Sequence, residues 1–251
     1  MDQMLQHTPI KAKPAVGDGI VSENASWSFG GETAKHFEQH VSKSVPYYAA
    51  GHELVLSVSD FFVKDGSTCY ELGCSTGALT RRLAQRHKRS VRWVGIDIEP
   101  NMIEQAAAYL RQQAPGVDNV QYLVDDVLQH PFESTDFVVA YYTVQFVPPR
   151  VRQQVFDRVY QALNWGGAFV LFEKVRAPDA RFQDMATSLY IDYKLAQGYE
   201  PTEIIAKSRS LKGVLEPFTS AGNLDLLKRA GFVDVMTIFK HVCFEGFLCI
   251  K

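Results

Sequence analysis

The sequence is poor in cysteine and has no long apolar run. Its four cysteines, among 251 residues, lack the close paired spacing of a zinc site, and two lie in strand-like apolar segments. We interpret them as reduced thiols of the core: Cys69, Cys74, Cys243 and Cys249. No apolar segment approaches the roughly 18 residues of a membrane span, and the first residues lack the charged and apolar regions of a signal peptide. We therefore expect a cytoplasmic protein.

A strong charge of either sign is also absent. The formal net charge is −2 and the isoelectric point is near 6.4. Binding to nucleic acid or to an anionic membrane needs a basic field, which this composition does not supply. We therefore expect a small-molecule substrate, and neither a nucleic-acid nor a membrane partner. The sequence carries no clear ligand pattern for a metal, and we propose none.

The composition fits one α/β domain with additions. Hydrophobic residues make up 46% and charged residues 22% of the chain, which is enough apolar material for a substantial core. The first two dozen residues are rich in glycine, proline and lysine without periodicity, so we expect a flexible N-terminal arm over residues 1–26. Residues 27–251 should form a single domain. Within it we expect lid helices over about 32–62, which contain "SVPYY", and a helical insert over about 180–215.

From residue 68 onward, short apolar strands alternate with helical stretches. This rhythm is typical of βαβ units and a parallel sheet, and we predict a Rossmann-like α/β fold with a mostly parallel seven-stranded sheet. The expected strands cover residues 68–73, 92–98, 120–126, 137–147, 167–175, 233–239 and 244–251. The expected helices outside the lid cover residues 78–87, 100–113, 150–163, 181–199, 201–215 and 223–232.

The stretch "YELGCSTGALTRRL" joins the first strand to a helix through a glycine-turned loop. Gly73 and Gly77 turn the backbone at the carboxyl end of the strand, where parallel sheets bind ligands. Asp97 follows the second strand, 20 residues after Gly77, and suits a carboxylate that accepts both hydroxyls of a ribose. Asp125 and Asp126 follow the third strand, where a carboxylate can accept the amine of adenine. Because a serine replaces a glycine that a dinucleotide site needs, we predict S-adenosylmethionine as the ligand.

These segments resemble the class I S-adenosylmethionine-dependent methyltransferase superfamily, through "ELGCSTG", "GIDIEPNMIEQA", "VDDV" and "LNWGGAFVLFEK". Within it, the chain from about Phe29 to Lys251 is most similar to the carboxy-S-adenosylmethionine synthase family. That likeness rests on "SVPYY", "YELGCSTGALT", "YYTVQFV" and "KSRSLKGV". The resemblance implies an enzyme that uses prephenate as a carboxyl donor and makes a carboxylated sulfonium. It also implies a homodimer.

The resemblance assigns roles to individual residues. Tyr48 should approach the amino-acid tail of the cofactor, and Gly73 and Ser75 should line that tail. Asp97 should bind the ribose, and Asp126 should flank the adenine. The residues expected to bind the cofactor are Tyr48, Glu71, Gly73, Cys74, Ser75, Gly77, Asp97, Ile98, Asp126, Val127 and Tyr141.

Two positions depart from the family pattern. The arginine that binds the carboxylate in the family falls on Ser208, and an asparagine after the fourth strand becomes Tyr141. Arg209 stands one residue later, which turns a helical side chain by about 100°. A product carboxylate needs a fixed cation, so these departures count against carboxyl transfer. They favour a reaction within S-adenosylmethionine itself.

The expected reaction is therefore intramolecular cyclisation, in which the amine attacks the γ-carbon and yields azetidine-2-carboxylate and methylthioadenosine. Aromatic faces should stabilise the sulfonium, by roughly 0.5–2 kcal/mol each. The residues expected to act in catalysis are Tyr48, Tyr142, Thr143, Tyr190 and Ser208.

Three alternatives stay open: methyl transfer to a small acceptor, carboxyl transfer, and a non-catalytic module that senses S-adenosylmethionine. Methyl transfer would need a base, and the sequence places His36, His40 and His52 beside no clear partner. We expect the N-terminal arm and the helical insert to close over the ligand and exclude water.

Overall fold

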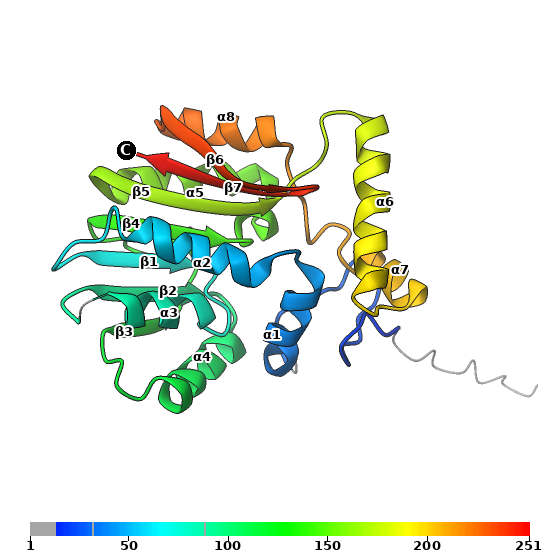
Figure 1. Cartoon of the computed structure of the whole chain (residues 1–251), viewed down its shortest axis with the longest axis horizontal. Helices are drawn as coiled ribbons and strands as arrows, with labels where there is room; N and C mark the ends of the chain where they lie inside the picture. Colours follow the sequence, from blue (N-terminus) through cyan, green and yellow to red (C-terminus); the bar gives the residue numbers. More distant parts are fainter. Residues whose placement is uncertain (1–13, 32, 88) are drawn as a thin grey trace, which may run out of the picture.

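A seven-stranded sheet organises the chain, which we describe from a computed structural model covering residues 14–31, 33–87 and 89–251. The strand order is β3-β2-β1-β4-β5-β7-β6, and β7 runs antiparallel to both of its neighbours while the other pairs are parallel (Figure 1). This confirms the mostly parallel sheet expected from the sequence. The strands are β1 (Thr68–Leu72), β2 (Arg92–Asp97), β3 (Val120–Val124), β4 (Thr135–Tyr141), β5 (Leu163–Lys174), β6 (Asp234–His241) and β7 (Phe244–Ile250).

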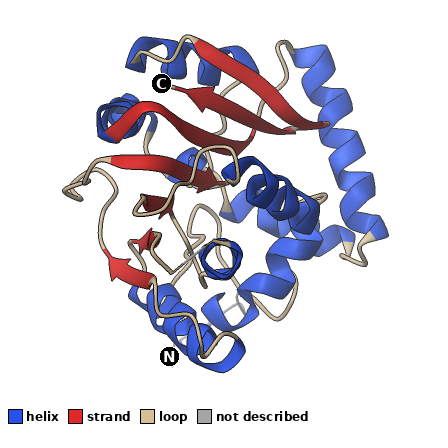
Figure 2. Cartoon of the chain, turned by 60° about the vertical axis from the view of Figure 1, so that its left-hand side comes forward, coloured by secondary structure: helices blue, strands red, loops and turns tan. Residues whose placement is uncertain are grey.

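Helices cover both faces of the sheet (Figure 2). Alternate residues of β4 face opposite ways, so Phe137 and Val139 join the core under α2 and α3, while Val138 and Ala140 join the core under α5 and α8. The helices are α1 (Thr33–Ser44), α2 (Tyr48–Ser59), α3 (Ala78–Arg86), α4 (Pro100–Gln113), the 3₁₀ helix η1 (Val144–Phe146), α5 (Pro149–Ala162), α6 (Ala180–Ala196), α7 (Pro201–Ser210) and α8 (Ser220–Ala230). No helix among the described residues is long and apolar enough to cross a bilayer.

Two expected elements end earlier than the sequence suggested. The strand predicted over residues 137–147 stops at Tyr141, because Tyr142 adopts a left-handed backbone with φ 61° and the chain continues as η1. The helix predicted over residues 201–215 stops at Ser210, and Gly213 follows with φ 75°. Both stops lie beside the cavity described below, where local hydrogen bonds outweigh the apolar periodicity.

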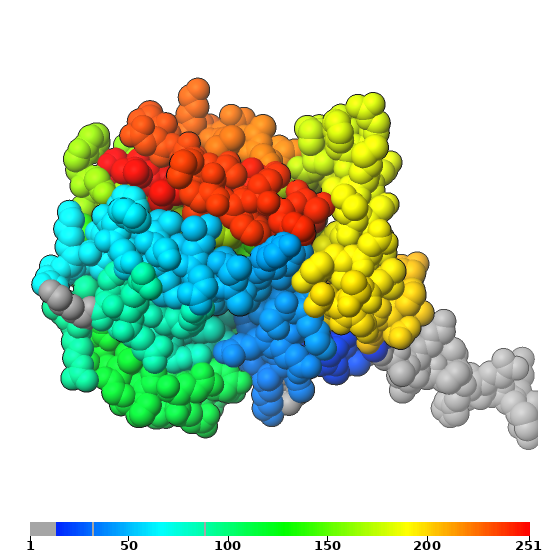
Figure 3. All heavy atoms as spheres, in the orientation of Figure 1, coloured from blue at the N-terminus to red at the C-terminus, as the bar shows by residue number. Residues whose placement is uncertain are grey.

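Residues 14–26 do not form the flexible arm expected from their composition. Val16, Ile20 and Trp27 are buried in a small apolar cluster, and the amides of Ala25 and Trp27 donate to carbonyl groups at the end of α7. Figure 3 shows this blue segment against the yellow α6–α7 region. The remainder of the expected arm, residues 1–13, lies outside the described residues.

The four cysteines are buried and free. Burial raises the pKa of each thiol, most clearly at Cys69, Cys74 and Cys249. Three of them fill the two cores beside the sheet, as expected of reduced core thiols, and Cys74 lies in the loop after β1.

Candidate functional site

A cavity of about 1030 Å³ opens at the carboxyl ends of β1, β2, β3 and β4, beneath α1, α6 and α7. β1 lies between β2 on one side and β4 on the other, so the strand order reverses at this point. Doubly wound sheets bind their ligands at such a reversal. Every residue that the sequence assigned to the site lines this cavity except Gly77. Gly77 supports the loop from behind: its φ is 73°, and a Cβ there would collide with the ring of Tyr122, whose hydroxyl donates to the Gly77 carbonyl at 3.1 Å.

The loop after β1 is fixed by its neighbours before any ligand arrives. The amides of Gly73 and Cys74 donate to the Ile96 carbonyl at 2.7 and 2.9 Å. Gly73 has φ 68° and lies directly against the side chain of Thr143, so a Cβ at this position has no room. Ser75 adopts φ 49°, an uncommon conformation for a residue with a side chain. The loop is therefore preorganised at the edge of the cavity.

Asp97 ends β2 and anchors this loop. One carboxylate oxygen accepts from the Ser75 amide at 2.8 Å, and the other accepts from the Glu99 amide at 3.0 Å. Burial raises the pKa of Asp97, although the two amides oppose that shift. Each oxygen of a carboxylate has a further acceptor site. The group can therefore accept two more hydrogen bonds from vicinal hydroxyls.

The two acids after β3 differ in what they can offer a ligand. Asp125 contacts the His130 ring at 2.8 Å and accepts from the Asp126 amide at 2.8 Å, so each of its oxygens already has one protein partner. Asp126 uses one oxygen to accept from the Leu128 amide at 2.9 Å. Its other oxygen remains for an exocyclic amine. Ile98 is 65% exposed on the same wall and offers an apolar surface beside it.

Three tyrosines enclose the middle of the cavity. The ring centroid of Tyr141 lies 5.1 Å from that of Tyr48 and 4.8 Å from that of Tyr142. The Tyr141 hydroxyl donates to the Tyr48 carbonyl at 2.7 Å, and only a glycine at position 51 leaves room for it. Burial raises the pKa of Tyr48 and Tyr142, so both stay neutral. Their faces can cover a sulfonium ion.

Glu71 forms part of the floor of the cavity near these rings. It is buried, and the Thr80 hydroxyl donates to it. Burial raises its pKa to about 8, which keeps the carboxyl group largely neutral at pH 7.

Four lysines line the other half of the cavity, under α6 and α7. We call three of them the lysine group: Lys174, Lys194 and Lys207; the fourth is Lys212. The ammonium groups of Lys174 and Lys194 lie 4.2 and 4.4 Å from the ring centroid of Tyr190, and that of Lys207 lies over the Trp27 ring. Within residues 14–31, 33–87 and 89–251, no carboxylate forms an ion pair with any of the three. Burial lowers their pKa values, that of Lys194 to about 8, and repulsion from neighbouring cations adds to this effect.

The remaining predicted catalytic residues hold structural contacts as well. The Thr143 hydroxyl donates to the Gly73 carbonyl at 3.4 Å, and the Tyr190 hydroxyl donates to the Ser44 carbonyl at 2.8 Å. Ser208 is exposed on α7 at the cavity edge, next to Arg209. Ser208 supplies no cation at its own position, but the lysine group lies in the same cavity.

One histidine has a partner that the sequence did not reveal. His40 Nδ1 lies 2.9 Å from Asp18 Oδ2, and its Nε2 lies 3.3 Å from Ser44 Oγ. Asp18 lies 22 positions earlier in the N-terminal segment, so the pair could not be predicted from the local spacing of residues. His36 is exposed, and His52 is buried against the rings of Tyr48 and Tyr141. In the described part of the chain, no three His, Cys, Asp or Glu residues lie close enough together to hold a metal ion.

Comparison with known proteins identifies the family of this chain. Residues 70–167 match a family described as "Methyltransferase domain". The "Carboxy-S-adenosyl-L-methionine synthase" of Staphylococcus epidermidis is 36% identical over 229 residues, which span 90% of this chain and 97% of that protein. The protein of the same name from Campylobacter lari is 32% identical over 225 residues, which span 90% of this chain and 94% of the other.

Solved structures support the fold alone. The magnesium protoporphyrin IX methyltransferase of Synechocystis, solved with bound SAH, superposes with a TM-score of 0.58 over 84% of this chain and 86% of its own, at 16% identity. The S-adenosylmethionine-dependent methyltransferase SibL superposes with a TM-score of 0.58 over 82% of this chain and 55% of its own, at 17% identity.

Proposed function

Because the chain belongs to the carboxy-S-adenosyl-L-methionine synthase family, we propose that it moves a carboxyl group from a small anionic donor to the methyl carbon of S-adenosylmethionine. The chain is an enzyme of the methyltransferase fold that uses S-adenosylmethionine. The finer assignment, carboxyl transfer from a bound donor, is the proposal.

One half of the cavity supports the binding of the cofactor. Asp97 has free acceptor sites for the ribose, and Asp126 has one for the adenine amine. The amino-acid tail would lie along Gly73 and Ser75, with the sulfonium beneath the rings of Tyr48 and Tyr142. The neutral tyrosine faces attract a desolvated cation without forming a bond to it.

The observation that carries the proposal is the lysine group. Three ammonium groups without a carboxylate partner are costly in a partly buried wall, because burial and repulsion both disfavour their charged forms. An anionic ligand would relieve that cost. The cavity volume of about 1030 Å³ also lies at the upper end of the roughly 300–1000 Å³ typical of ligand pockets, which favours two occupants over one.

The proposed transfer needs no oxidant. One C–H bond of the sulfonium methyl group breaks, and the bond that joins the carboxyl group to its donor breaks. A new carbon–carbon bond forms between the carboxyl and methyl carbons. The proton lost from the methyl group ends on the donor fragment or on a group that leaves it. The lysine group would hold the carboxylates of the donor, and the tyrosines would hold the sulfonium beside it.

Mass spectrometry of the products tests this proposal. The purified protein is incubated with S-adenosylmethionine alone, with prephenate added, and without enzyme. We expect a carboxylated S-adenosylmethionine only when both compounds and the enzyme are present. Intact S-adenosylmethionine in all three samples, or a methylated acceptor with S-adenosylhomocysteine, would contradict the proposal.

Intramolecular cyclisation is the second candidate, and a specific observation favours it. The tyrosines surround the expected position of the sulfonium, and the lysine group places positive charge nearby, which lowers the pKa of an ammonium group. A neutral amine is the form that can attack the γ-carbon. Methylthioadenosine formed from S-adenosylmethionine alone would establish this reaction and displace carboxyl transfer.

A further inference from the structure

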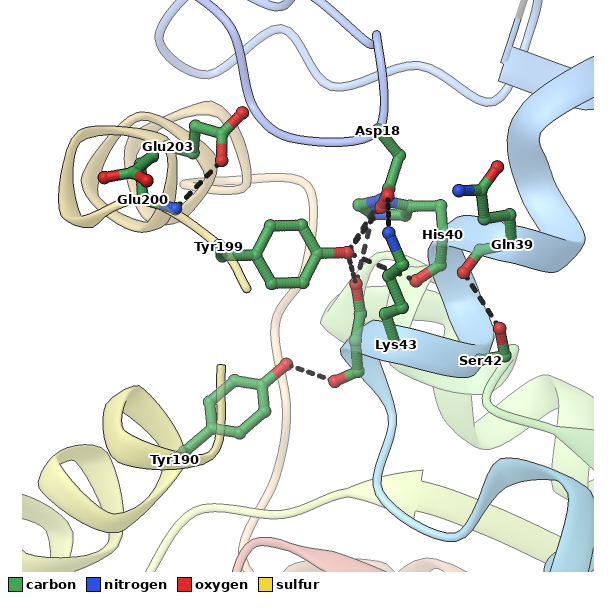
Figure 4. Close-up of polar contacts among 10 residues, drawn as sticks. Asp18, Gln39, His40, Ser42, Lys43, Tyr190, Tyr199, Glu200 and Glu203 are labelled. Carbon is green, nitrogen blue, oxygen red and sulfur yellow. Dashed lines mark hydrogen bonds and ion pairs between the residues drawn. The ribbon is translucent and has the colours of Figure 1, made fainter. Parts of the chain in front are cut away.

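A chain of three polar side chains crosses the wall between the cavity and the N-terminal segment. His40 Nδ1 lies 2.9 Å from Asp18 Oδ2 (Figure 4). Ser44 Oγ lies 3.3 Å from His40 Nε2. The side chain of Asp18 is only 3% exposed and that of His40 only 7%. These residues come from the N-terminal segment and from α1, and neither Asp18 nor Ser44 belongs to the site predicted from the sequence.

The hydrogen bonds around Asp18 determine the tautomer of His40. Burial opposes ionisation of Asp18, but hydrogen bonds from Lys43, Tyr199 and His40 outweigh it and lower the pKa of the acid. An ionised carboxylate only accepts, so His40 Nδ1 must carry the proton and donate to it. Nε2 is then a free acceptor for the Ser44 hydroxyl.

The surroundings of His40 favour its neutral form. Burial first, and then the charges of Lys207 on α7 and Lys194 on α6, lower its pKa to about 4, against the opposing effect of Asp18. The other groups that face it are the Tyr199 hydroxyl from the α6–α7 turn and the Trp27 ring, which stacks on it at 5.6 Å. A neutral imidazole with an oriented acceptor nitrogen can take up a proton.

The outer end of this chain opens on the lysine group. His40 and Ser44 both line the main cavity, together with Lys194 and Lys207. The same four residues also line a smaller pocket of about 10 Å³ against Tyr199. The Ser44 hydroxyl is therefore placed beside the half of the cavity that the donor would occupy.

We propose that Ser44, His40 and Asp18 form a proton relay that serves the second substrate. The inference rests on the proposed carboxyl transfer, in which the methyl group loses a proton that ends on the donor fragment or on a group that leaves it. Ser44 exchanges a proton with the bound reactants, and His40 Nε2 holds that proton between its loss and its return. Asp18 fixes the imidazole and stabilises its cation, so it acts as a positioning residue.

A purely structural role explains only part of this network. Asp18 also accepts from Lys43 at 2.8 Å and from Tyr199 at 2.5 Å, and these bonds tie the N-terminal segment to α1 and to the α6–α7 turn. A latch of that kind does not need the bond between His40 and Ser44. Ser44 Oγ also lies 3.1 Å from the Tyr199 hydroxyl and so takes part in the latch, but His40 and Ser44 both belong to α1, and the hydrogen bond between these two holds no other segment in place.

The test compares turnover, cofactor affinity and melting temperature in matched variants. With S-adenosylmethionine and prephenate, we expect His40→Gln and Asp18→Asn to lower kcat by about 10²–10³-fold, and Ser44→Ala by at least tenfold, consistent with the usual worth of general acid–base catalysis. The affinity for S-adenosylmethionine should change less than threefold. His36→Gln, an exposed histidine on the same helix, should match the wild type.

Tyr199→Phe separates a relay from a latch, because it removes the hydroxyl that contacts Asp18 at 2.5 Å and Ser44 Oγ at 3.1 Å, while the His40–Asp18 and His40–Ser44 pairs keep their own side chains. The relay predicts a lower melting temperature with kcat reduced no more than threefold. If His40→Gln keeps its turnover, or if turnover falls in all variants only in proportion to melting temperature and cofactor affinity, the relay is refuted.

A nuclear magnetic resonance measurement keeps this inference separate from the proposed reaction. If the wild type forms no carboxylated product, the proposed function fails. The tautomer and the titration of the His40 imidazole still test the relay in that case. We expect the Nδ1–H tautomer, and an upward shift of more than one pH unit in its titration when prephenate is bound. A proton on Nε2, or a titration that prephenate leaves unchanged, would overturn the relay.

Discussion

In the half of the cavity above β1, β2 and β3, most polar groups already have protein partners, whereas the lysine group under α6 and α7 has none among the described carboxylates. The first half is built from the loop after β1 and from the acids at the strand ends, which are held by backbone amides. The second half is built from β5, α6, α7, α1 and the N-terminal segment. The first half, whose polar groups already have protein partners, suits a neutral or cationic ligand. The second half, whose lysines have no carboxylate partner, suits an anionic ligand.

The largest effect should come from breaking the first half at Asp97. Asp97→Ala removes the acceptor for the ribose and the anchor of the Ser75 amide. Hydrogen bonds to a charged group are worth about 1.5–3 kcal/mol each, so we expect calorimetry to show at least about a hundredfold loss of S-adenosylmethionine affinity. Asp118→Ala, an exposed acid paired with Arg89, is the control. Retained affinity in Asp97→Ala would overturn the cofactor site.

Removing two cations should affect only the second half. For Lys174→Met combined with Lys207→Met, we expect the KM for prephenate to rise at least about thirtyfold, because removing one partner of a partly buried charge pair costs roughly 2–5 kcal/mol. Cofactor affinity should stay within threefold. The melting temperature should not fall, since two unpaired buried charges are lost. A lower melting temperature with an unchanged KM would make these lysines structural.

The cover over the sulfonium can be tested at Tyr142, where the two halves meet. Tyr142→Phe keeps the ring and should change kcat less than threefold. Tyr142→Ala removes a cation–π contact of about 0.5–2 kcal/mol, which corresponds to a loss of roughly twofold to thirtyfold in turnover. Equal losses of turnover in both variants would assign the effect to the hydroxyl group. If neither variant lost turnover, Tyr142 would have only a packing role.

Donor binding should weaken in alkaline solution because of Lys194. Burial lowers its pKa to about 8, so the ammonium form that attracts an anion is present below that pH and lost above it. We expect the KM for prephenate to rise severalfold between pH 7.5 and pH 9. This corresponds to a loss of roughly 1 kcal/mol of binding free energy when one of the three lysines becomes neutral. Lys194→Arg keeps its charge and should flatten this rise. The same rise in the arginine variant would assign the titration to another group.

The stability of the fold should depend on two buried histidines. Burial lowers the pKa of His40 to about 4 and that of His52 to about 3, from a usual value of 6.5. At a pH between 6.5 and these lowered values, the two histidines are protonated in the unfolded chain and neutral in the folded chain. The free energy of unfolding therefore falls as the pH drops below 6.5. His52→Phe should reduce that loss by about 3 kcal/mol at pH 4 in urea titrations. An unchanged slope would show that His52 is not buried in solution.

Except for Gly77, the residues that the sequence assigned to the first half of the site line one cavity, and they could be found because their signals are local. The glycines of the loop, Asp97 and Asp126 each follow a strand, and strand ends of a parallel sheet meet at one edge. The residue ranges of most elements follow from the alternation of apolar strands with helical stretches.

The second half was harder to predict because its parts are distant along the chain. The lysine group comes from three elements, β5, α6 and α7. The spacing of these lysines along the sequence does not indicate that they line one cavity. Asp18 lies in a glycine-rich segment that composition alone marked as flexible, yet it binds His40 and Tyr199. Tyr142 ends its strand through a left-handed backbone, which apolar periodicity cannot reveal.

Isotope labelling of both reactants tests the central claim most directly. The protein is incubated with S-adenosylmethionine that carries a CD₃ group on sulfur and with prephenate labelled with ¹³C in its carboxyl groups. Carboxyl transfer predicts a product that keeps two of the three deuterium atoms and gains one ¹³C atom, because one C–D bond is exchanged for a carbon–carbon bond. A CD₃ group found intact on another molecule, or retained in methylthioadenosine, would contradict the account.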